Sequence, residues 1–546
     1  MKMNQRSMDK GISIEGGKKF LREENSLNKG SEKDIEELEA FFTPIAKRFP
    51  SLGKAFKTST SYYFYDAGTG KVLQCGDKIF KILKQWEASC DFKSILNNFE
   101  IPLNDLIEEL LELKSAVDKE NIMQAKLIEH FYLPENVDNY ISTHVNMITL
   151  ELTERCNLRC KYCIYQDFNE GYRGYGERDM TIETARHAID LLVKHSADVE
   201  PEKKLIVTFY GGEPLLKFDL IKQCVEYAES KKVDHEWLFA ITTNCTMLTD
   251  EKIQYFAEKG FTLTASIDGY KEIHDANRVY PNGDGSFEIA LKNLEKLAIE
   301  YKKRDVEGPH ISINSVITPP YDFEKLNKLQ KFYSSLKWLP KDARITWAYA
   351  QPDPNKTKEE TEREMARIKI GDEMELNPIS AWHYDNMSSI ERELFTREGE
   401  MRSLMGIHER HIVNAPITFA PLNACCIPGS RRIYVTVDGK LKVCERIGES
   451  PDIGNVIEGL DFEAIRRYFY DEYIEKSLPS CKDCWTVQMC ALCYMYCYNK
   501  DGIDMDRKRL SCERIKFLNE RSLVRYHELL ENNPQGLKNL LNLEYN

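Results

Sequence analysis

The regular alternation of two sequence patterns between residues 145 and 350 constrains the fold more than any other feature of the chain. Short apolar segments rich in β-branched residues are followed by amphipathic stretches, such as 181–195 and 286–303, whose apolar residues recur at helical spacing. Such β–α repeats favour parallel strands joined by right-handed crossovers. We therefore predict an α/β fold here, a partial (β/α)6 barrel. Its strands are expected within residues 147–154, 205–212, 239–244, 263–269, 310–318 and 344–350.

Unusual residues stand at the carboxyl ends of four of these predicted strands. "CNLRCKYC" (156–163) follows the first strand and "GGEP" (211–214) follows the second. "TTN" ends the third strand at Asn244, and "SIDG" (266–269) ends the fourth. In parallel α/β barrels the loops after the carboxyl ends of the strands carry the chemistry. The sequence therefore predicts one site at this rim of the barrel.

The first of these loops contains three cysteines, Cys156, Cys160 and Cys163, separated by three and then by two residues. A closed tetrahedral metal site needs four protein ligands, and no further cysteine or histidine is close in the sequence. Three thiolates can instead hold three corners of a [4Fe–4S] cluster and leave one iron open to another ligand. The alternative is a zinc knuckle completed by a distant residue.

This loop resembles the signature of the radical S-adenosylmethionine (radical SAM) enzymes, and the resemblance extends over about residues 145–350. It implies that the open iron binds the amino and carboxylate groups of S-adenosylmethionine (SAM). It also implies that the glycines of "GGEP" let the backbone approach the cofactor, whose ammonium group Glu213 meets. Taken alone, "GGEP" would be an ordinary β–α turn and Arg278 an ordinary loop cation. The implied cofactor-binding residues are Tyr162, Gly211, Gly212, Glu213, Pro214, Asn244, Ser266 and Arg278.

A second group of cysteines lies between residues 425 and 512. Twelve residues separate Cys426 from Gly439, four more precede Cys444, and "CKDCWTVQMCALCYMYC" follows later. This order resembles the SPASM extension of peptide-modifying radical SAM enzymes, which implies two auxiliary [4Fe–4S] clusters. CXXC pairs are also typical of zinc ribbons, which are the alternative. The candidate ligands are Cys426, Cys444, Cys481, Cys484, Cys490, Cys493 and Cys512, with Cys425 and Cys497 as competing choices.

The resemblance also divides these ligands between two clusters. The outer cluster takes Cys481, Cys484, Cys490 and Cys512, and the inner cluster takes Cys426, Cys444 and Cys493. The fourth inner ligand of fully coordinated relatives lies upstream, where this chain has Ala420 and Pro421. We therefore predict an open inner iron, to which a substrate cysteine thiolate could bind. Glu445, directly after Cys444, is a candidate base because sulfatase maturases place an aspartate there.

Residues 36–140 are predicted to form a small unit of β-strands followed by helices. "TSYYFYD" and "KVLQC" flank the turn "AGTG" as a hairpin, and the segments after it have helical spacing. The unit resembles the winged-helix RiPP recognition element, which captures a leader peptide as an added strand. A regulatory or dimerisation domain is the alternative. The remaining segments are predicted as a disordered start (1–35), a helical bridge (351–415), a SPASM domain (416–515) and a final helix and tail (516–546).

Composition and charge argue against several other classes of protein. The net charge of −13 leaves no basic stripe for a nucleic acid. The polar start lacks the apolar core of a signal peptide, and no apolar run is long enough for a membrane span. We therefore predict a cytoplasmic protein whose 16 cysteines are reduced rather than joined in disulfides.

Together these expectations describe an enzyme that modifies a ribosomally synthesised precursor peptide. The resemblance implies SAM, three [4Fe–4S] clusters, a peptide bound through its leader, and an electron donor such as flavodoxin or ferredoxin. Formation of cysteine thioethers, as in sactipeptide and ranthipeptide maturation, is the favoured reaction. Carbon–carbon cross-linking, or residue oxidation of the sulfatase-maturase kind, is one alternative. A non-catalytic zinc-binding protein is the alternative from another class.

Overall fold

The computed structural model describes residues 32–98, 102–124, 126, 128–132, 136–166, 173–306, 310–318, 323–340, 343–350, 404–421, 426–430, 432–535 and 537. Most of the predicted disordered start and of the predicted helical bridge lies outside these residues. Within them, no helix is both long enough and apolar enough to cross a membrane.

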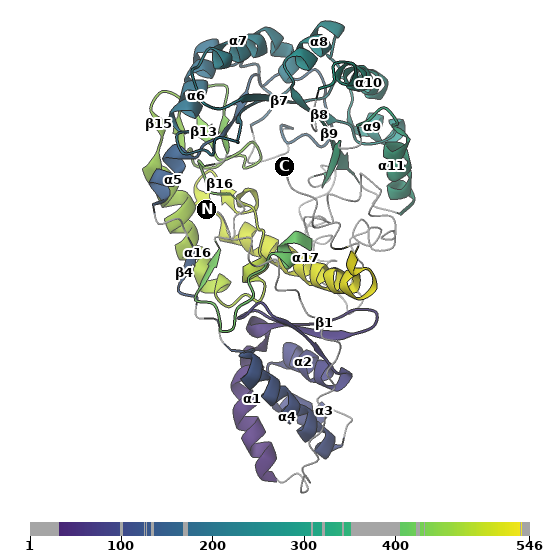
Figure 1. Ribbon diagram of the computed structural model, residues 1–546, viewed down its shortest axis with the longest axis vertical. Helices are drawn as coiled ribbons and strands as arrows, with labels where there is room; N and C mark the ends of the chain where they lie inside the picture. Colours follow the sequence, from purple (N-terminus) through teal and green to yellow (C-terminus); the bar gives the residue numbers. More distant parts are fainter. Residues whose placement is uncertain are drawn as a thin grey trace.

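The N-terminal part of the chain forms a unit of its own, at the lower end of Figure 1. Its three-stranded antiparallel sheet contains β1 (Gly53–Lys57), β2 (Tyr62–Asp66) and β3 (Val72–Cys75). Helices surround a core centred on the fully buried Trp86. They are α1 (Glu32–Leu52), α2 (Asp77–Ser89), α3 (Lys93–Asn98) and α4 (Leu103–Glu120). The order of a hairpin followed by helices agrees with the prediction, while the winged-helix assignment stays a prediction.

The expected disorder of residues 32–35 is wrong, because α1 begins at Glu32. Leu38 and Phe42 are buried in the core of the N-terminal unit, and Ile35 packs against it from the first turn. These three positions recur at helical spacing, so burial of one apolar face stabilises the helix from its start. The sequence analysis predicts neither α1 nor β1.

The middle of the chain forms an eight-stranded sheet in the order β10-β9-β8-β7-β6-β5-β12-β13. Six of its parallel strands overlap the six predicted segments, with β7 and β8 beginning two residues and one residue earlier than predicted, which confirms the α/β core. They are β5 (Met147–Glu151), β6 (Leu205–Tyr210), β7 (Trp237–Thr243), β8 (Thr262–Ser266), β9 (Ile311–Ile317) and β10 (Arg344–Tyr349). Helices form an outer arc around this sheet (Figure 1). They are α6 (Ile182–Lys194), α7 (Phe218–Glu229), α8 (Asp250–Glu258), α9 (Lys271–Asn277), α10 (Phe287–Lys303) and α11 (Phe323–Ser335).

The sheet continues beyond the predicted barrel through two strands from the cysteine-rich part of the chain. β12 (Arg432–Val435) pairs in parallel with β5, and β13 (Leu441–Lys442) pairs antiparallel with β12. A partial barrel leaves the edge of its first strand unpaired, and β12 covers that edge. The sheet therefore crosses the predicted domain boundary and brings Cys444, just after β13, beside the barrel.

Short elements carry most of the other C-terminal cysteines. α16 (Glu472–Cys481) ends at one cysteine, and η5 (Val487–Met489) and η6 (Tyr494–Tyr496) separate the next ones. The long helix α17 (Met505–Asn532) begins earlier than predicted, so Cys512 lies within it rather than before it. The reason is a cap at Asp504, whose side chain accepts hydrogen bonds from the backbone N–H groups of Asp506 and Arg507.

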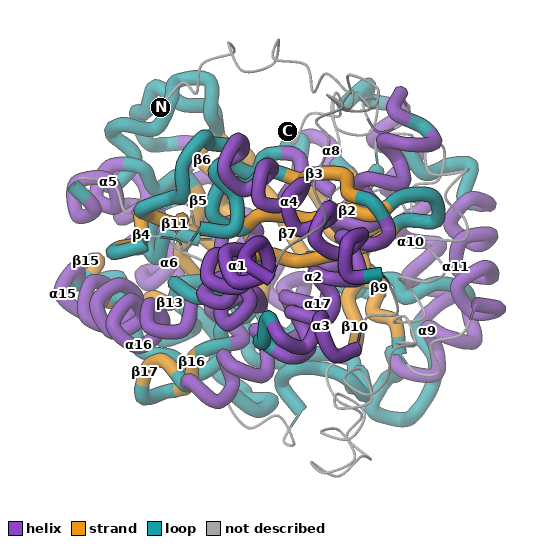
Figure 2. Tube along the Cα trace, turned by 90° about the horizontal axis from the view of Figure 1, so that it is seen from below, coloured by secondary structure: helices purple, strands orange, loops and turns teal. Residues whose placement is uncertain are grey.

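The N-terminal unit projects from one end of the molecule, as Figures 1 and 2 show together, and its sheet packs against α17. Phe56 and Tyr65 share a buried core with Trp485. Lys126 donates hydrogen bonds to the carbonyl oxygens of Ser51 at 2.6 Å and Cys484 at 2.9 Å. The unit is thus joined to the loop that carries the predicted outer ligands.

Candidate active site and cysteine groups

The loop with Cys156, Cys160 and Cys163 follows β5 and is held by backbone hydrogen bonds to the end of α9 and the segment after it. The N–H of Arg159 donates to the carbonyl of Val279 at 2.7 Å, and that of Lys161 donates to Asn277 at 3.0 Å. Burial raises the pKa of Cys156 to about 12, with contributions from Glu213 and from the other two thiols. The structure therefore brings the three thiols together. Coordination to iron would stabilise their thiolates against this burial.

Gly211 and Gly212 allow the turn after β6 to pass directly against the start of the cysteine loop. A Cβ atom on Gly211, whose φ is +133°, would lie 2.4 Å from the carbonyl oxygen of Thr153. A Cβ atom on Gly212 would lie 2.1 Å from the carbonyl oxygen of Arg155. The sequence analysis expects these glycines to let the backbone approach a cofactor. The contact seen here is instead with the backbone that leads into the cysteine loop.

Glu213 is 1% exposed and joins the ends of β6 and β7. One carboxylate oxygen accepts hydrogen bonds from the Leu215 N–H at 3.1 Å and the Thr243 hydroxyl at 2.7 Å. The other accepts from the Asn244 N–H at 2.9 Å. An ionised carboxylate offers about four acceptor positions, so one remains for an ammonium group. Pro214 follows as the first residue of η2 (Pro214–Lys217), which Glu213 caps.

Asn244 holds the cysteine loop from the end of β7. Its side-chain amide donates to the side-chain oxygen of Asn157 at 2.9 Å, and Asn157 donates to the Thr246 hydroxyl at 2.8 Å. Asn157 stands directly after Cys156 in the sequence. Asn244 therefore lies at the rim, where it was predicted. Its side-chain amide contacts the cysteine loop.

Arg278 is buried beside the same loop. Its Nη1 lies 3.9 Å from the sulfur of Cys160, and its Nε lies 3.1 Å from a carboxylate oxygen of Asp268. The Tyr162 hydroxyl donates to the other oxygen of Asp268. Burial, together with the charge of Asp268, raises the pKa of Tyr162. Asp268 thus connects two predicted cofactor-binding residues, and the sequence analysis missed it although it lies in "SIDG". Ser266, two residues earlier, is half-buried at the end of β8.

Residues 150–332, which contain all of these contacts, match the family model described as the radical SAM superfamily. The chain contains a radical SAM domain. It is 30% identical over 162 residues to the cysteine-type anaerobic sulfatase-maturating enzyme of Clostridium novyi, covering 29% of this chain and 41% of that one. It is 23% identical over 277 residues to the radical SAM cyclopropyl synthase TigE of Paramaledivibacter caminithermalis, covering 48% of this chain and 55% of that one. The chain thus spans about half the length of these relatives.

The solved structure of native anSMEcpe with bound AdoMet covers 71% of this chain and 99% of its own, with a TM-score of 0.50 and 18% identity. At that identity the likeness concerns the fold. The donor set of the radical SAM domain fits the cofactors that the superfamily implies. Three neighbouring thiols suit a [4Fe–4S] cluster with an open iron, and Glu213 keeps an acceptor position beside them.

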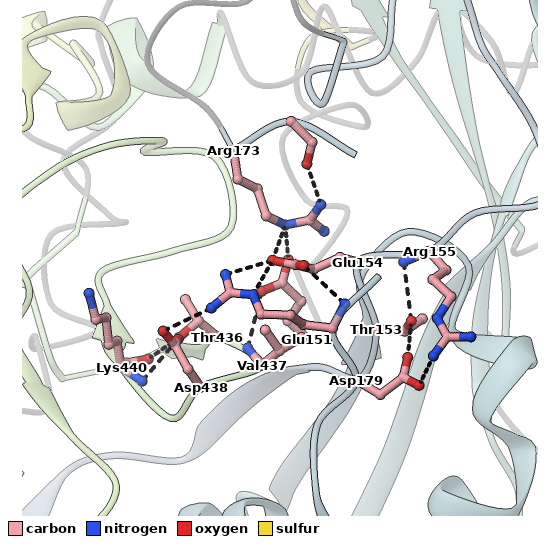
Figure 3. Close-up of polar contacts among 12 residues, drawn as sticks. Glu151, Thr153, Glu154, Arg155, Arg173, Asp179, Thr436, Val437, Asp438 and Lys440 are labelled. Atoms are coloured by element: carbon pink, nitrogen blue, oxygen red, sulfur yellow. Dashed lines mark hydrogen bonds and ion pairs between the residues drawn. The ribbon is translucent and has the colours of Figure 1, made fainter. Parts of the chain in front are cut away.

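A network of charges around two buried glutamates links the radical SAM domain to the turn between β12 and β13 (Figure 3). Glu151 and Glu154, at the end of β5, are 2% and 4% exposed. Arg173 pairs with Glu151 at 2.5 Å, and Arg178 pairs with Glu154 at 2.7 Å. Arg178 also reaches Asp438 at 3.3 Å. The sequence analysis missed this network, which fixes the segment after the cysteine loop against the C-terminal part.

Glu445, the candidate base, lies where the radical SAM domain meets the inner cysteines. Both of its carboxylate oxygens accept hydrogen bonds from Arg432 Nη1, at 2.9 and 3.1 Å. Tyr210, at the end of β6, has its pKa raised by burial, by Glu445 and by Cys163. Tyr210 thus neighbours both the first cysteine loop and the residue after Cys444. The role of Glu445 as a base stays a prediction.

The four predicted outer ligands come together around α16 and α17. Burial raises the pKa of Cys490 to about 12, and the thiols of Cys484, Cys481 and Cys512 contribute. Cys484 follows Cys481 in a tight turn closed by a backbone hydrogen bond of 3.0 Å. Among the described residues, no three His, Cys, Asp or Glu side chains converge on a single metal ion. A four-iron cluster is wider than one ion, and its cysteine ligands stand farther apart.

Two of the predicted inner ligands lie next to each other. Burial, Glu445 and then Cys426 raise the pKa of Cys444 to about 12, so Cys426 and Cys444 are neighbours. Cys497 is fully buried, and Lys508, Cys512, Cys490 and Arg507 influence its thiol, which also lies 3.6 Å from the carbonyl oxygen of Cys493. Cys497 therefore lies toward the outer group. Cys425 lies outside the described residues.

Proposed function

We propose that the chain is a radical SAM peptide maturase that forms cysteine thioethers in a ribosomally synthesised precursor peptide. The observation that carries this proposal is the position of Tyr210, whose phenol is influenced by both Cys163 and Glu445. The SAM-binding loop and the inner cysteines then face one substrate site. A substrate held at this rim would have its reacting carbon near SAM and its sulfur near the inner cluster.

The chain's own residues would position and shield the reactants. Cys156, Cys160 and Cys163 hold the cluster, and the Tyr162–Asp268–Arg278 contacts fix the loop beside it. Glu213 directs its remaining acceptor position to the ammonium group of SAM. When bound and reduced, the cluster and SAM supply a 5′-deoxyadenosyl radical that removes a hydrogen atom from an unactivated carbon. Glu213, Asp268 and Arg278 are buried and would help to exclude water from that site.

The proposed inner cluster keeps one iron open for the substrate thiolate. The position of Cys497 supports this, because its thiol is influenced by Cys490 and Cys512 of the outer group. Thiolate binding to iron would deprotonate the substrate cysteine and hold its sulfur in place. Thioether formation then removes two hydrogen atoms from the peptide. The hydrogen atom from carbon would pass to the 5′-deoxyadenosyl radical, while the sulfur would lose its proton to a base or solvent and the remaining electron would pass to the inner cluster.

The proposed leader-binding site is the free edge of the N-terminal sheet. In the described part of the chain β3 pairs only with β2, whereas β1, at the other edge, packs against α17. An exposed strand edge can accept an extended peptide as a further strand. Precursor binding should slow hydrogen–deuterium exchange of the amides in 72–75 and leave those in 53–57 unchanged. Equal exchange at 72–75 with and without peptide would contradict this assignment.

The reaction is tested by co-expression with small cysteine-rich peptides encoded beside the gene. The proposed product is lighter than its precursor by two hydrogen atoms for each thioether, and its modified cysteine no longer alkylates. A Cys156→Ala variant should leave the peptide unmodified. A product that lacks the two hydrogen atoms but retains all its free thiols would contradict thioether formation.

A second candidate function is residue oxidation of the sulfatase-maturase kind, favoured by the match to the Clostridium novyi enzyme. Incubation with a cysteine-type or serine-type sulfatase peptide distinguishes the two. An aldehyde formed on that peptide would favour the second candidate. Thioether formation in the co-expressed precursor would favour the first.

A further inference from the structure

A lysine side chain is buried among the thiols of the outer group. Lys508 is 1% exposed, and its Nζ lies 3.5 Å from the sulfur of Cys481 and 3.8 Å from that of Cys512. Within the described residues no carboxylate forms an ion pair with it. Burial of an ammonium group is unfavourable unless an anion or hydrogen-bond acceptor compensates it. Here the nearest compensating groups are cysteine sulfurs.

The local structure fixes Lys508 in this position. α17 begins directly after Asp504, and Lys508 and Cys512 are four residues apart, so they lie on one face of the helix. Cys481 is the last residue of α16, which brings it to the same point. The ring of Tyr473, itself fully buried, lies 5.7 Å from Nζ and closes the pocket from another side. The ammonium group therefore has no route to solvent and points at two sulfurs.

We propose that Lys508 donates hydrogen bonds to the sulfurs of the outer cluster and thereby raises its reduction potential. The inference rests on the proposed outer cluster and goes beyond it by assigning a residue that tunes it. Reduction adds one electron and makes the cluster one charge more negative. A buried cation at its sulfurs stabilises the reduced form more than the oxidised form, and hydrogen bonds to sulfur are known to set such potentials. With this cation at its sulfurs, the outer cluster would accept an electron more readily than a cluster that has only a structural role.

The test is a redox titration with dithionite on the full-length protein, followed by EPR. The signal that Cys512→Ala removes is assigned to the outer cluster. In Lys508→Met we expect the ratio of reduced to oxidised cluster at a fixed potential to fall about tenfold. For a one-electron couple this corresponds to about 59 mV. Lys508→Arg, which keeps the charge, should stay close to the wild-type potential.

Lys476→Met is the matched control. Lys476 lies on α16, is paired with Glu472 at 2.5 Å, and its side chain is 43% exposed. Solvent screens its charge, so its removal should leave the ratio unchanged. An unshifted potential in Lys508→Met at wild-type iron content would overturn the inference.

Loss of iron in Lys508→Met is handled by Lys508→Leu, a second variant that removes both the charge and the N–H donors. A wild-type potential in this variant would overturn the inference, and a lowered one would support it. If neither neutral variant holds the cluster, recovery by Lys508→Arg supports the need for a cation, and failure to recover contradicts it. Unchanged iron and sulfide in Cys512→Ala and Cys481→Ala would instead refute the outer cluster itself.

Discussion

Arg278 and Asp268 form a buried ion pair, 3.1 Å between Nε and Oδ1, beside the first cysteine loop. Asp268 also accepts a hydrogen bond from the backbone N–H of Val316 at 3.0 Å, so it is fixed to β9. The pair therefore fixes the positions of Tyr162 and of the Cys160 thiol relative to the sheet.

Asp268→Asn should lower SAM cleavage by about a hundredfold, because Arg278 loses its partner and the cysteine loop its support. An unpaired buried charge should also lower the free energy of unfolding by about 3 to 5 kcal/mol. The measurements are 5′-deoxyadenosine formation and denaturant unfolding. Asp284→Asn, an exposed change in the loop after Arg278, should alter neither. Wild-type cleavage in Asp268→Asn would contradict the role given to the pair.

Gly212→Ala should displace the cysteine loop, because its Cβ would lie 2.1 Å from the carbonyl oxygen of Arg155. We expect iron in the first cluster and SAM cleavage to fall together, while iron in the C-terminal clusters is retained. Gly406→Ala is the control, since a Cβ there meets no atom within 4 Å. Full iron content with normal cleavage in Gly212→Ala would show that the loop tolerates the shift.

His527 should make the docking of the N-terminal unit dependent on pH. Its ring packs against Phe56 and Tyr63, and burial lowers its pKa to about 4. Between pH 6.5 and 4 the unfolded state binds the extra proton, so stability falls as the pH falls. The full contribution is about 3 kcal/mol. His527→Gln should flatten the dependence of the melting temperature on pH in this range, and the exposed His187→Gln should not. An equally steep dependence in His527→Gln would contradict this assignment.

Precursor peptide should change the EPR or Mössbauer signal of the inner cluster, because its cysteine thiolate would occupy the open iron. A peptide with that cysteine replaced by serine should leave the signal unchanged. Cys497→Ala should not affect the inner signal, since Cys497 lies toward the outer group. Identical spectra with both peptides would favour Cys425 as the missing ligand.

The central sheet could be predicted because the sequence patterns of its strands and helices are local. Each of the six parallel strands is an apolar segment bounded by a turn, and each is followed by a helical pattern. The pairing of β12 with β5 could not be predicted, because the four residues "RIYV" do not show which strand they will pair with. The helix α1 was not predicted, because charged residues interrupt the apolar face that begins at Ile35.

The rim of the candidate site could also be predicted, since its motifs follow the strand ends. The contacts between residues within the site could not be predicted. Asp268 was visible in "SIDG", but its contact with Tyr162 joins residues 106 positions apart. Lys508 resembles any other lysine of a charged helix until α16 brings Cys481 beside it. Such pairings depend on the tertiary structure and leave no local signal.

The most direct test of the account is SAM cleavage by the purified, anaerobically reconstituted and dithionite-reduced protein. We predict formation of 5′-deoxyadenosine and methionine by the wild type. Replacement of Cys156, Cys160 and Cys163 together by alanine should abolish both products, while most of the iron stays bound at the C-terminal cysteines. Continued formation of 5′-deoxyadenosine by the triple variant, or its absence from the reduced wild type, would contradict the assignment.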